Sequence, residues 1–248
     1  MKQFYLLVYS LALGTAGVIY FVVFPMSATG KNIKEGGPLV MILMAMSILV
    51  FSFIIERFIS LRRAQGKGSM VVFIQQLRQM LLEKNIARAI SLCDRQQGSL
   101  ANVVRAGLVR YETVAGRMNP EKRLLETKRA VEEANALEVP LLERNLISLS
   151  TIASIGTMVG LLGTVIGMIR AFAASSEAGA PDAASLALGI SEALYNTAGG
   201  IFVGICGIVS YNYFVNRVDS FNYLMDEATY EMLQILEENT EGLGEHNV

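Results

Sequence analysis

Four long stretches of the chain contain no charged side chain, and they are separated by segments in which apolar residues recur at helical spacing. The uncharged stretches are residues 3–30, 36–55, 145–169 and 193–216. A helix needs about 20 mostly apolar residues to cross a hydrocarbon core of roughly 30 Å. The pattern therefore predicts four transmembrane helices. We place the first at about 4–24, the second at 37–60, the third from about residue 147 and the fourth at 186–214.

The first of these stretches has a second interpretation, a secretory signal peptide. The apolar region of a signal peptide runs to about 7–15 residues, and residues 4–24 form a longer apolar run. Only Lys2 precedes it, and the sequence MSATG at residues 26–30 offers no good cleavage site. We expect an uncleaved transmembrane helix, with a cleaved leader as the alternative.

The polar segments also predict helices and no strand. Between residues 62 and 146, runs such as VVFIQQLRQMLL and NIARAISLCDRQ place apolar residues three and four positions apart. Breaks are expected at Gly66 and Gly68, and again at Gly116 with Pro120. From Pro120 a long helix, kinked at Pro140, is expected to run straight into the third span. The fourth span is expected to continue as an amphipathic helix over about 217–238.

The fold class expected is an all-α polytopic membrane protein whose long transmembrane helices extend into a cytoplasmic helical bundle. Five regions follow from the pattern. They are an N-terminal helix with a short periplasmic loop (1–35), the second transmembrane helix (36–61), a cytoplasmic helical domain (62–146), the third and fourth transmembrane helices (147–216), and a C-terminal cytoplasmic helix and tail (217–248).

The distribution of basic residues sets the expected orientation. Fifteen Lys and Arg lie between residues 62 and 147, whereas the loop at 175–185 has none. Cytoplasmic segments carry the excess of Lys and Arg, so residues 62–147 should lie inside, although Lys31 and Lys34 are a weaker counter-signal. Both termini are then cytoplasmic. Arg57, Arg62 and Arg63 are expected to anchor the second span and to touch anionic lipid.

Composition removes several classes of function. The chain is 52% apolar and only 17% charged, with a net charge of −1 and no basic stripe, which gives no reason to expect a nucleic-acid partner. Cys93 and Cys206 lie in different regions, and the single histidine, His246, is in the tail, so neither a disulfide nor a metal or other cofactor is expected. The catalytic motifs HExxH, GxSxG and GxxxxGK[ST] are absent, so we expect no enzyme and no catalytic residue.

Two stripes of small residues run along the third and fourth spans. One contains Gly156, Gly160, Gly163 and Gly167, with Thr157 and Thr164 seven residues apart beside them; the other contains Thr197, Gly200, Gly204 and Gly207. Small residues let helices approach closely in lipid. One interpretation is therefore a packing seam alone, in which the threonines bond to carbonyls of their own helix. The other is a polar route for an ion.

Glu192 favours the second interpretation. Charged groups inside a membrane are costly and usually face a bundle interior or a water-filled cavity. Asn196 lies four residues further on and Thr197 comes next, so the polar positions continue toward the middle of the span. The alternative is a glutamate at the membrane interface that reaches the outer water, paired with Arg170.

These residues carry a resemblance. The sequence GLLGTVIGMIRAF at 160–172, followed by GISEALYNTAGGIFVGICGIVSYNYF at 189–214, resembles the MotA/TolQ/ExbB group of ion-driven motor subunits, and its details look closest to ExbB and TolQ. The likeness covers about residues 36–235. Thr157 and Cys206 stand where the group has prolines, and the loss of both prolines should straighten the two helices. This departure leaves the type of ion open between proton and sodium, of which the proton is commoner in the group.

The resemblance implies a partner set and a mechanism. Such proteins form a homo-oligomeric ring, commonly a pentamer, in the bacterial inner membrane, which is therefore the expected location of this chain. The ring surrounds a single-span subunit of the ExbD or TolR type that carries an aspartate. Ion flow drives work on a TonB-like or TolA-like protein. The ion-pathway candidates are then Thr164, Thr197 and Glu192, with Thr157 and Asn196 beside them. Import of the ExbB type, envelope maintenance of the TolQ type, a gliding or flagellar stator, and a non-conducting membrane scaffold all remain open.

Overall fold

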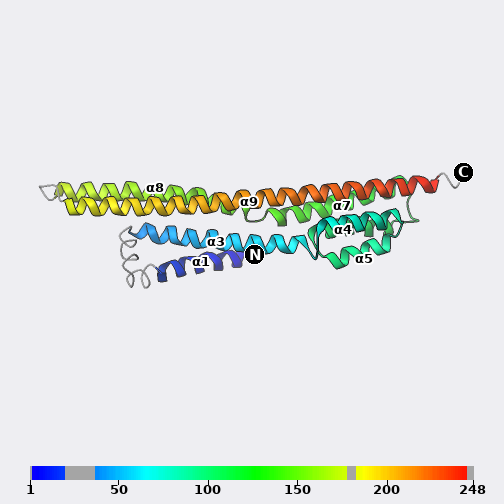
Figure 1. The fold of residues 1–248 in the computed structure, drawn as a ribbon, viewed down its shortest axis with the longest axis horizontal. Coiled ribbons are helices and arrows are strands. Elements are labelled where there is room, and N and C mark those ends of the chain that lie inside the picture. The colour runs from blue at the N-terminus through cyan, green and yellow to red at the C-terminus, as the bar shows by residue number, and fades with distance from the viewer. Residues whose placement is uncertain (1, 20–36, 178–182, 245–248) are drawn as a thin grey trace. The chain divides into compact units, whose positions relative to one another are not determined.

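A computed structural model describes residues 2–19, 37–177 and 183–244, and the ordered elements within them are helices with no strand. The elements are α1 (Lys2–Val18), α3 (Pro38–Gln65), α4 (Met70–Leu82), α5 (Ile86–Gln96), α6 (Ser99–Thr113), α7 (Pro120–Glu143), α8 (Leu146–Glu177) and α9 (Ala183–Gly244). Figure 1 shows their arrangement along the chain. The predicted all-α fold class is confirmed.

Three helical stretches among the described residues are long and apolar enough to cross a membrane. They lie within residues 38–82, 120–174 and 183–239, and their most apolar windows have mean hydropathies of 2.6, 2.0 and 1.5. These stretches correspond to the second, third and fourth predicted spans. The first predicted span, 4–24, is described only as far as residue 19, and the loop containing Lys31 and Lys34 lies outside the described residues.

The predicted breaks in the polar region are confirmed. Gly66 and Gly68 separate α3 from α4, and both take a positive φ, 71° and 92°, which glycine adopts without a steric penalty. Gly116, with φ 73°, follows α6. Pro120 then occupies the first turn of α7, and the Asn119 side chain caps that helix by accepting from the backbone N–H of Lys122.

One prediction about this region is wrong. The helix from Pro120 does not run straight into the third span, because α7 ends at Glu143 and α8 begins at Leu146. Between them Asn145 takes a left-handed conformation with φ 64°. Pro140, three residues before the end of α7, has no N–H to bond to the preceding turn. The continuation of the fourth span is confirmed, since α9 is one helix of 62 residues.

The chain divides into two compact units. The first contains Met1–Glu56 and Asn145–Phe214, and the second contains Arg57–Arg144 and Val215–Val248. In the first unit, α8 and the first half of α9 run antiparallel and side by side (Figure 1). They provide the surface on which the candidate site lies.

The second unit is a helical bundle with α6 at its centre. Leu100, Val103, Val104 and Leu108 of α6 are completely buried. Gly107 lies so close to Val131 of α7 and Met232 of α9 that a methyl group there would lie 2.6 Å and 3.0 Å from their side chains. In the C-terminal half of α9 the buried apolar residues recur every three or four positions up to Ile235, with Leu236 directly after it, which is the amphipathic pattern expected for this segment. They are Val218, Phe221, Met225, Ala228, Met232, Ile235 and Leu236.

Candidate functional site

The glycine stripes of α8 and α9 face each other within one chain. A Cβ atom built on Gly160 would lie 2.8 Å from the Cα atom of Gly200, and one built on Gly200 would lie 2.7 Å from the Cα atom of Gly160. At this point the two backbones are in direct contact. Only residues without a Cβ allow so close an approach.

The other glycines predicted to pack helices lie in the same seam. A Cβ on any of them would come closer than 3.0 Å to the opposing helix; they are Gly156 against Val203, Gly163 against Asn196, Gly167 against Gly189, Gly204 against Thr157, and Gly207 against Ala153. The seam therefore serves contact between α8 and α9 of this chain. The close access that these glycines could give to a partner's helix is already used within the chain.

Sequence reasoning missed one member of the seam, Gly189. A Cβ on it would lie 2.5 Å from the Cβ of Ala171, which is itself buried. The signal was present, because Gly189, Ala193, Asn196 and Gly200 follow each other at spacings of four, three and four residues. Extending the stripe toward the start of the fourth span by two turns would have found it.

Thr164 and Thr197 meet across the seam. Their Oγ1 atoms are 2.7 Å apart, and both side chains are partly exposed. Each hydroxyl also has a carbonyl of its own helix within reach. The Oγ1 of Thr164 lies 3.3 Å from the carbonyl oxygen of Gly160, and that of Thr197 lies 3.2 Å from the carbonyl oxygen of Ala193.

This geometry gives the hydroxyl pair two proton arrangements with the same heavy atoms. A threonine hydroxyl donates one hydrogen bond and accepts others. Either Thr164 donates to Thr197, which then donates to Ala193, or Thr197 donates to Thr164, which then donates to Gly160. Reversal needs only rotation of two O–H bonds. The pair can thus accept from a visiting polar group, and it can donate to one if a hydroxyl gives up its bond to the carbonyl of Gly160 or Ala193; neither needs a change in helix packing.

Thr157 lies two turns from Thr164 on the same side of α8. Its Oγ1 donates to the carbonyl of Ala153, 3.1 Å away, and the side chain is half-buried against Gly204. Both α8 and α9 continue without interruption through Thr157 and Cys206, the positions at which the resembling group has prolines.

The acidic candidate lies on a different side of α9. The Oε1 of Glu192 accepts from Nη1 of Arg170 at 2.7 Å, and the two side chains are 13% and 54% exposed. Gly37, just before α3, lies against this pair. Because successive residues of a helix turn by about 100°, Glu192 and Thr197 project about 140° apart. The pairing with Arg170 is the alternative that the sequence left open for Glu192.

Asn196 is completely buried between the two helices. Its Nδ2 donates to the backbone carbonyl of Glu192 at 3.0 Å, and its Cβ packs against Gly163. The residue therefore fills the seam, and it is not on the partly exposed flank where the two threonine hydroxyls lie.

The three arginines predicted to contact lipid have different environments. Arg57 is 1% exposed, and its Nη1 donates to the carbonyl of Leu142 at 3.1 Å. The bond satisfies one of the last carbonyls of α7, which have no partner within their helix. Arg62 and Arg63 are exposed, and the guanidinium of Arg62 lies 4.4 Å from the centre of the Phe58 ring.

The described geometry defines a class of protein: an all-α polytopic membrane protein with two glycine-packed spans that hold a pair of hydroxyls across their interface. A comparison of the sequence with known protein families gives a result consistent with this class. The model of the MotA/TolQ/ExbB proton channel family matches residues 95–227, which is more than half of the chain. The chain belongs to this family.

Relatives with two different names are similar to the chain. The Tol-Pal system protein TolQ of Haemophilus influenzae is 35% identical over 127 residues, 51% of this chain and 56% of that protein. The biopolymer transport protein ExbB of Salmonella typhimurium is 27% identical over 177 residues, 66% of this chain and 70% of that protein. The match to the TolQ of Pseudomonas aeruginosa covers 59% of that protein, so the chain spans under two thirds of both TolQ relatives.

Proposed function

We propose that the chain is the ion-conducting subunit of an inner-membrane motor of the ExbB type, with the proton as its ion. It forms a homo-oligomeric ring, with a pentamer as the first stoichiometry to test. Inside the ring lies a single-span partner of the ExbD type, and ion flow drives work on a TonB-like protein for import across the outer membrane. Both termini face the cytoplasm.

The observation that carries this proposal is the hydrogen bond between Thr164 and Thr197. The pair lies inside a segment without charges, is partly exposed, and can reverse its direction of donation at little cost. A neutral hydroxyl site binds a proton carrier or a carboxyl group weakly, so it does not trap the ion. Each charge that crosses the membrane releases about 2.3 kcal/mol per 100 mV, and a weak site preserves most of that energy for mechanical work.

Ion flux in proteoliposomes tests the proposal directly. The chain is reconstituted with its co-purified single-span partner, a potassium-diffusion potential is imposed, and proton entry is followed with an internal pH dye. Thr197→Val and Thr164→Val each remove one hydroxyl and keep the branched shape. Each variant loses one hydrogen bond worth about 1.4 kcal/mol during proton transfer, which lowers the rate of proton flux about tenfold. Wild-type flux in both variants would contradict a conducting role for the pair.

Thr151→Val is the matched control. Thr151 is on the same helix, and its Oγ1 makes the same kind of bond, to the carbonyl of Ile147 at 2.8 Å. It is exposed and lies thirteen residues from Thr164, which places it about 140° away around α8. Its replacement should leave proton flux unchanged. Sodium dependence of the wild-type flux would replace the proton by sodium as the ion.

A second candidate function is envelope maintenance of the TolQ type, which the identity to the Haemophilus influenzae TolQ favours. The partner separates the two candidates. Co-purification with a TolR-like and a TolA-like protein supports the TolQ type, whereas an ExbD-like and a TonB-like protein support import. Proton flux in both cases would exclude a non-conducting scaffold.

A further inference from the structure

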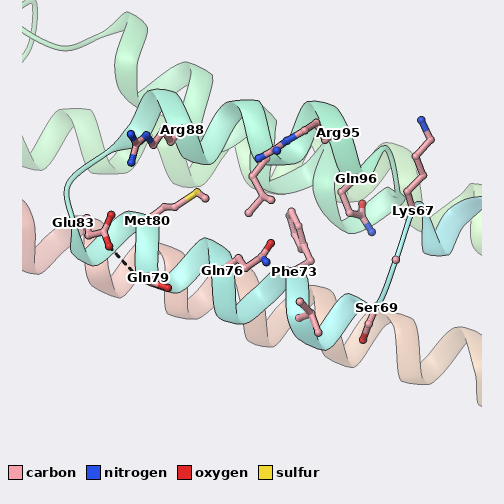
Figure 2. A pocket seen from close by; sticks show the side chains of 13 residues that line it. Lys67, Ser69, Phe73, Gln76, Gln79, Met80, Glu83, Arg88, Arg95 and Gln96 are labelled. Carbon is pink, nitrogen blue, oxygen red and sulfur yellow. Dashed lines mark hydrogen bonds between the residues drawn. The ribbon is translucent and has the colours of Figure 1, made fainter.

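The second unit has an open groove between α4 and α5 that plays no part in the ion pathway (Figure 2). Its volume is about 710 Å³. Apolar side chains line its middle, with Phe73 and Met80 contributed by α4 and Leu92 by α5. Phe73 and Leu92 are buried, Met80 is half-buried, and Val72, also in the lining, is exposed, so the groove offers apolar surface to a ligand.

The rim of the groove is basic. Lys67, Arg88 and Arg95 line it and are exposed, and none makes an ion pair with another residue in the described part of the chain. The one acid in the lining is Glu83, whose Oε1 accepts from Nε2 of Gln79 at 3.1 Å. The lining therefore carries a formal charge of +2 and is complementary to an acidic ligand.

The cations are arranged along the groove. Arg88 and Arg95 are seven residues apart on α5, so they project from the same side, two turns and about 10.5 Å apart along the axis. Figure 2 shows Arg88 above Met80 and Glu83 toward one end, with Arg95 closer to Gln96 and Lys67 at the other. A compact anion can reach only one of these ends. An elongated ligand with two acidic groups can reach both.

The groove is held open by the chain itself. Gln96 is buried, and its Nε2 donates to the carbonyl of Gln65 at 2.7 Å while its Oε1 accepts from the backbone N–H of Gly98 at 2.7 Å. The backbone N–H of Lys67 donates to the carbonyl of Gln96, also at 2.7 Å. These bonds fix the end of α5 against the segment that leads into α4. A preformed site loses less free energy to ordering when a ligand binds.

We propose that this groove binds an acidic amphipathic helical segment of a partner protein. Two carboxylates seven residues apart on the segment pair with Arg88 and Arg95, and apolar residues between them contact Met80 and the exposed Val72. The lining glutamines Gln76 and Gln79 offer amide groups to polar side chains at the edge of the segment. This docking site does not depend on the proposed ion pathway, since every lining residue belongs to the second unit.

Fluorescence anisotropy with the full chain in detergent micelles tests the proposal. The probe is a labelled 14-residue helical peptide on an alanine–glutamine host, with glutamate at its positions 4 and 11 and leucine at positions 7 and 8. Arg88→Gln combined with Arg95→Gln should weaken binding about tenfold, because two complementary charges are removed. The wild-type affinity should also fall as salt rises.

Matched controls identify the source of any loss. Lys122→Gln with Lys128→Gln removes the same charge from exposed positions of α7 and should leave peptide affinity unchanged. A peptide with glutamine in place of both glutamates should bind about tenfold more weakly than the acidic peptide. Equal affinity of the two peptides, or equal affinity of the groove variant and wild type, would overturn the proposal. So would a groove variant that loses binding to vesicles of phosphatidylglycerol and phosphatidylcholine but not to the peptide.

Discussion

Two adjacent glycines of α9 offer a sharp test of how closely α8 and α9 pack. Gly200 contacts the backbone of α8, whereas Gly199 faces Leu43 of α3. Replacing either by alanine adds one methyl group and gives the same gain in intrinsic helix propensity, about 1 kcal/mol. Any difference between the two variants therefore reports what the added methyl group meets.

The structure gives opposite expectations for the two positions. The new Cβ at Gly200 would lie 2.7 Å from the Cα of Gly160 and 2.8 Å from the carbonyl oxygen of Gly156. Carbon atoms pack best at about 3.5–4.0 Å, and backbone atoms cannot rotate away, so the helices must separate by about 1 Å. Overpacking of this kind costs about 1–3 kcal/mol. After the gain in propensity, Gly200→Ala should lower the free energy of unfolding by up to about 2 kcal/mol.

At Gly199 the nearest atom is 3.3 Å away and is the terminal Cδ1 of Leu43. A side-chain methyl group can move by a few tenths of an ångström, so little of the propensity gain is lost. Gly199→Ala should leave the free energy of unfolding unchanged or raise it by up to about 1 kcal/mol.

Denaturation in mixed micelles, followed by circular dichroism as the fraction of dodecyl sulfate rises, measures both variants. Gly200→Ala should unfold at a lower fraction of dodecyl sulfate than wild type and Gly199→Ala at the same or a higher one. Separation of the helices should also lengthen the bond between Thr164 and Thr197, so Gly200→Ala should reduce proton flux as well. Equal midpoints for the two alanine variants would refute the close backbone contact.

Three further predictions concern the second unit. Arg57→Met removes the buried bond to the carbonyl of Leu142 and should lower the free energy of unfolding in urea by about 1.5–3 kcal/mol; an unchanged midpoint would contradict it. Burial raises the pKa of the Cys93 thiol to about 12. In a Cys206→Ala background, which removes the other free cysteine, maleimide labelling of native Cys93 should therefore stay slow from pH 7 to 9 and become fast in denaturant. The hydrogen bond from Arg110, together with the nearby positive charges, lowers the pKa of Glu126. The stability that the ionised Glu126 contributes should therefore be lost as the pH falls through that lowered pKa. Glu126→Gln should make the melting temperature depend less on pH in that acidic range.

Periodicity alone places the glycines of each span on one side of its helix, but it left open whether that side packs within the chain or lines an ion route. The spacing of four, three and four residues places Gly156, Gly160, Gly163 and Gly167 on one side of α8, whatever the helix packs against. The fourth span carries a similar stripe, and a short connection makes the two helices antiparallel neighbours. Small residues are the ones that reward close approach in lipid, so the two stripes face each other.

The break before α8 depends on information that periodicity does not carry. The sequence through Asn145 reads as helical, and asparagine adopts the left-handed conformation only where surrounding contacts favour it. Here the Asn145 Nδ2 donates to Oε2 of Glu56 at 3.0 Å, across 89 positions of sequence. The burial of Arg57 has the same origin, because its partner Leu142 is 85 residues away. Contacts between residues so far apart in sequence form only in the folded structure, so the local sequence pattern does not predict them.

Glu192 and Thr197 are close in sequence but project from different sides of α9. In sequence, Glu192, Asn196 and Thr197 form one polar run, yet the helical turn puts the glutamate beside Arg170 and the threonine beside Thr164. The hydroxyl pair is neutral, whereas Glu192 is paired with the guanidinium of Arg170. The hydroxyl pair and the ion pair are therefore two separate features of these helices, although the sequence placed their residues in one polar run.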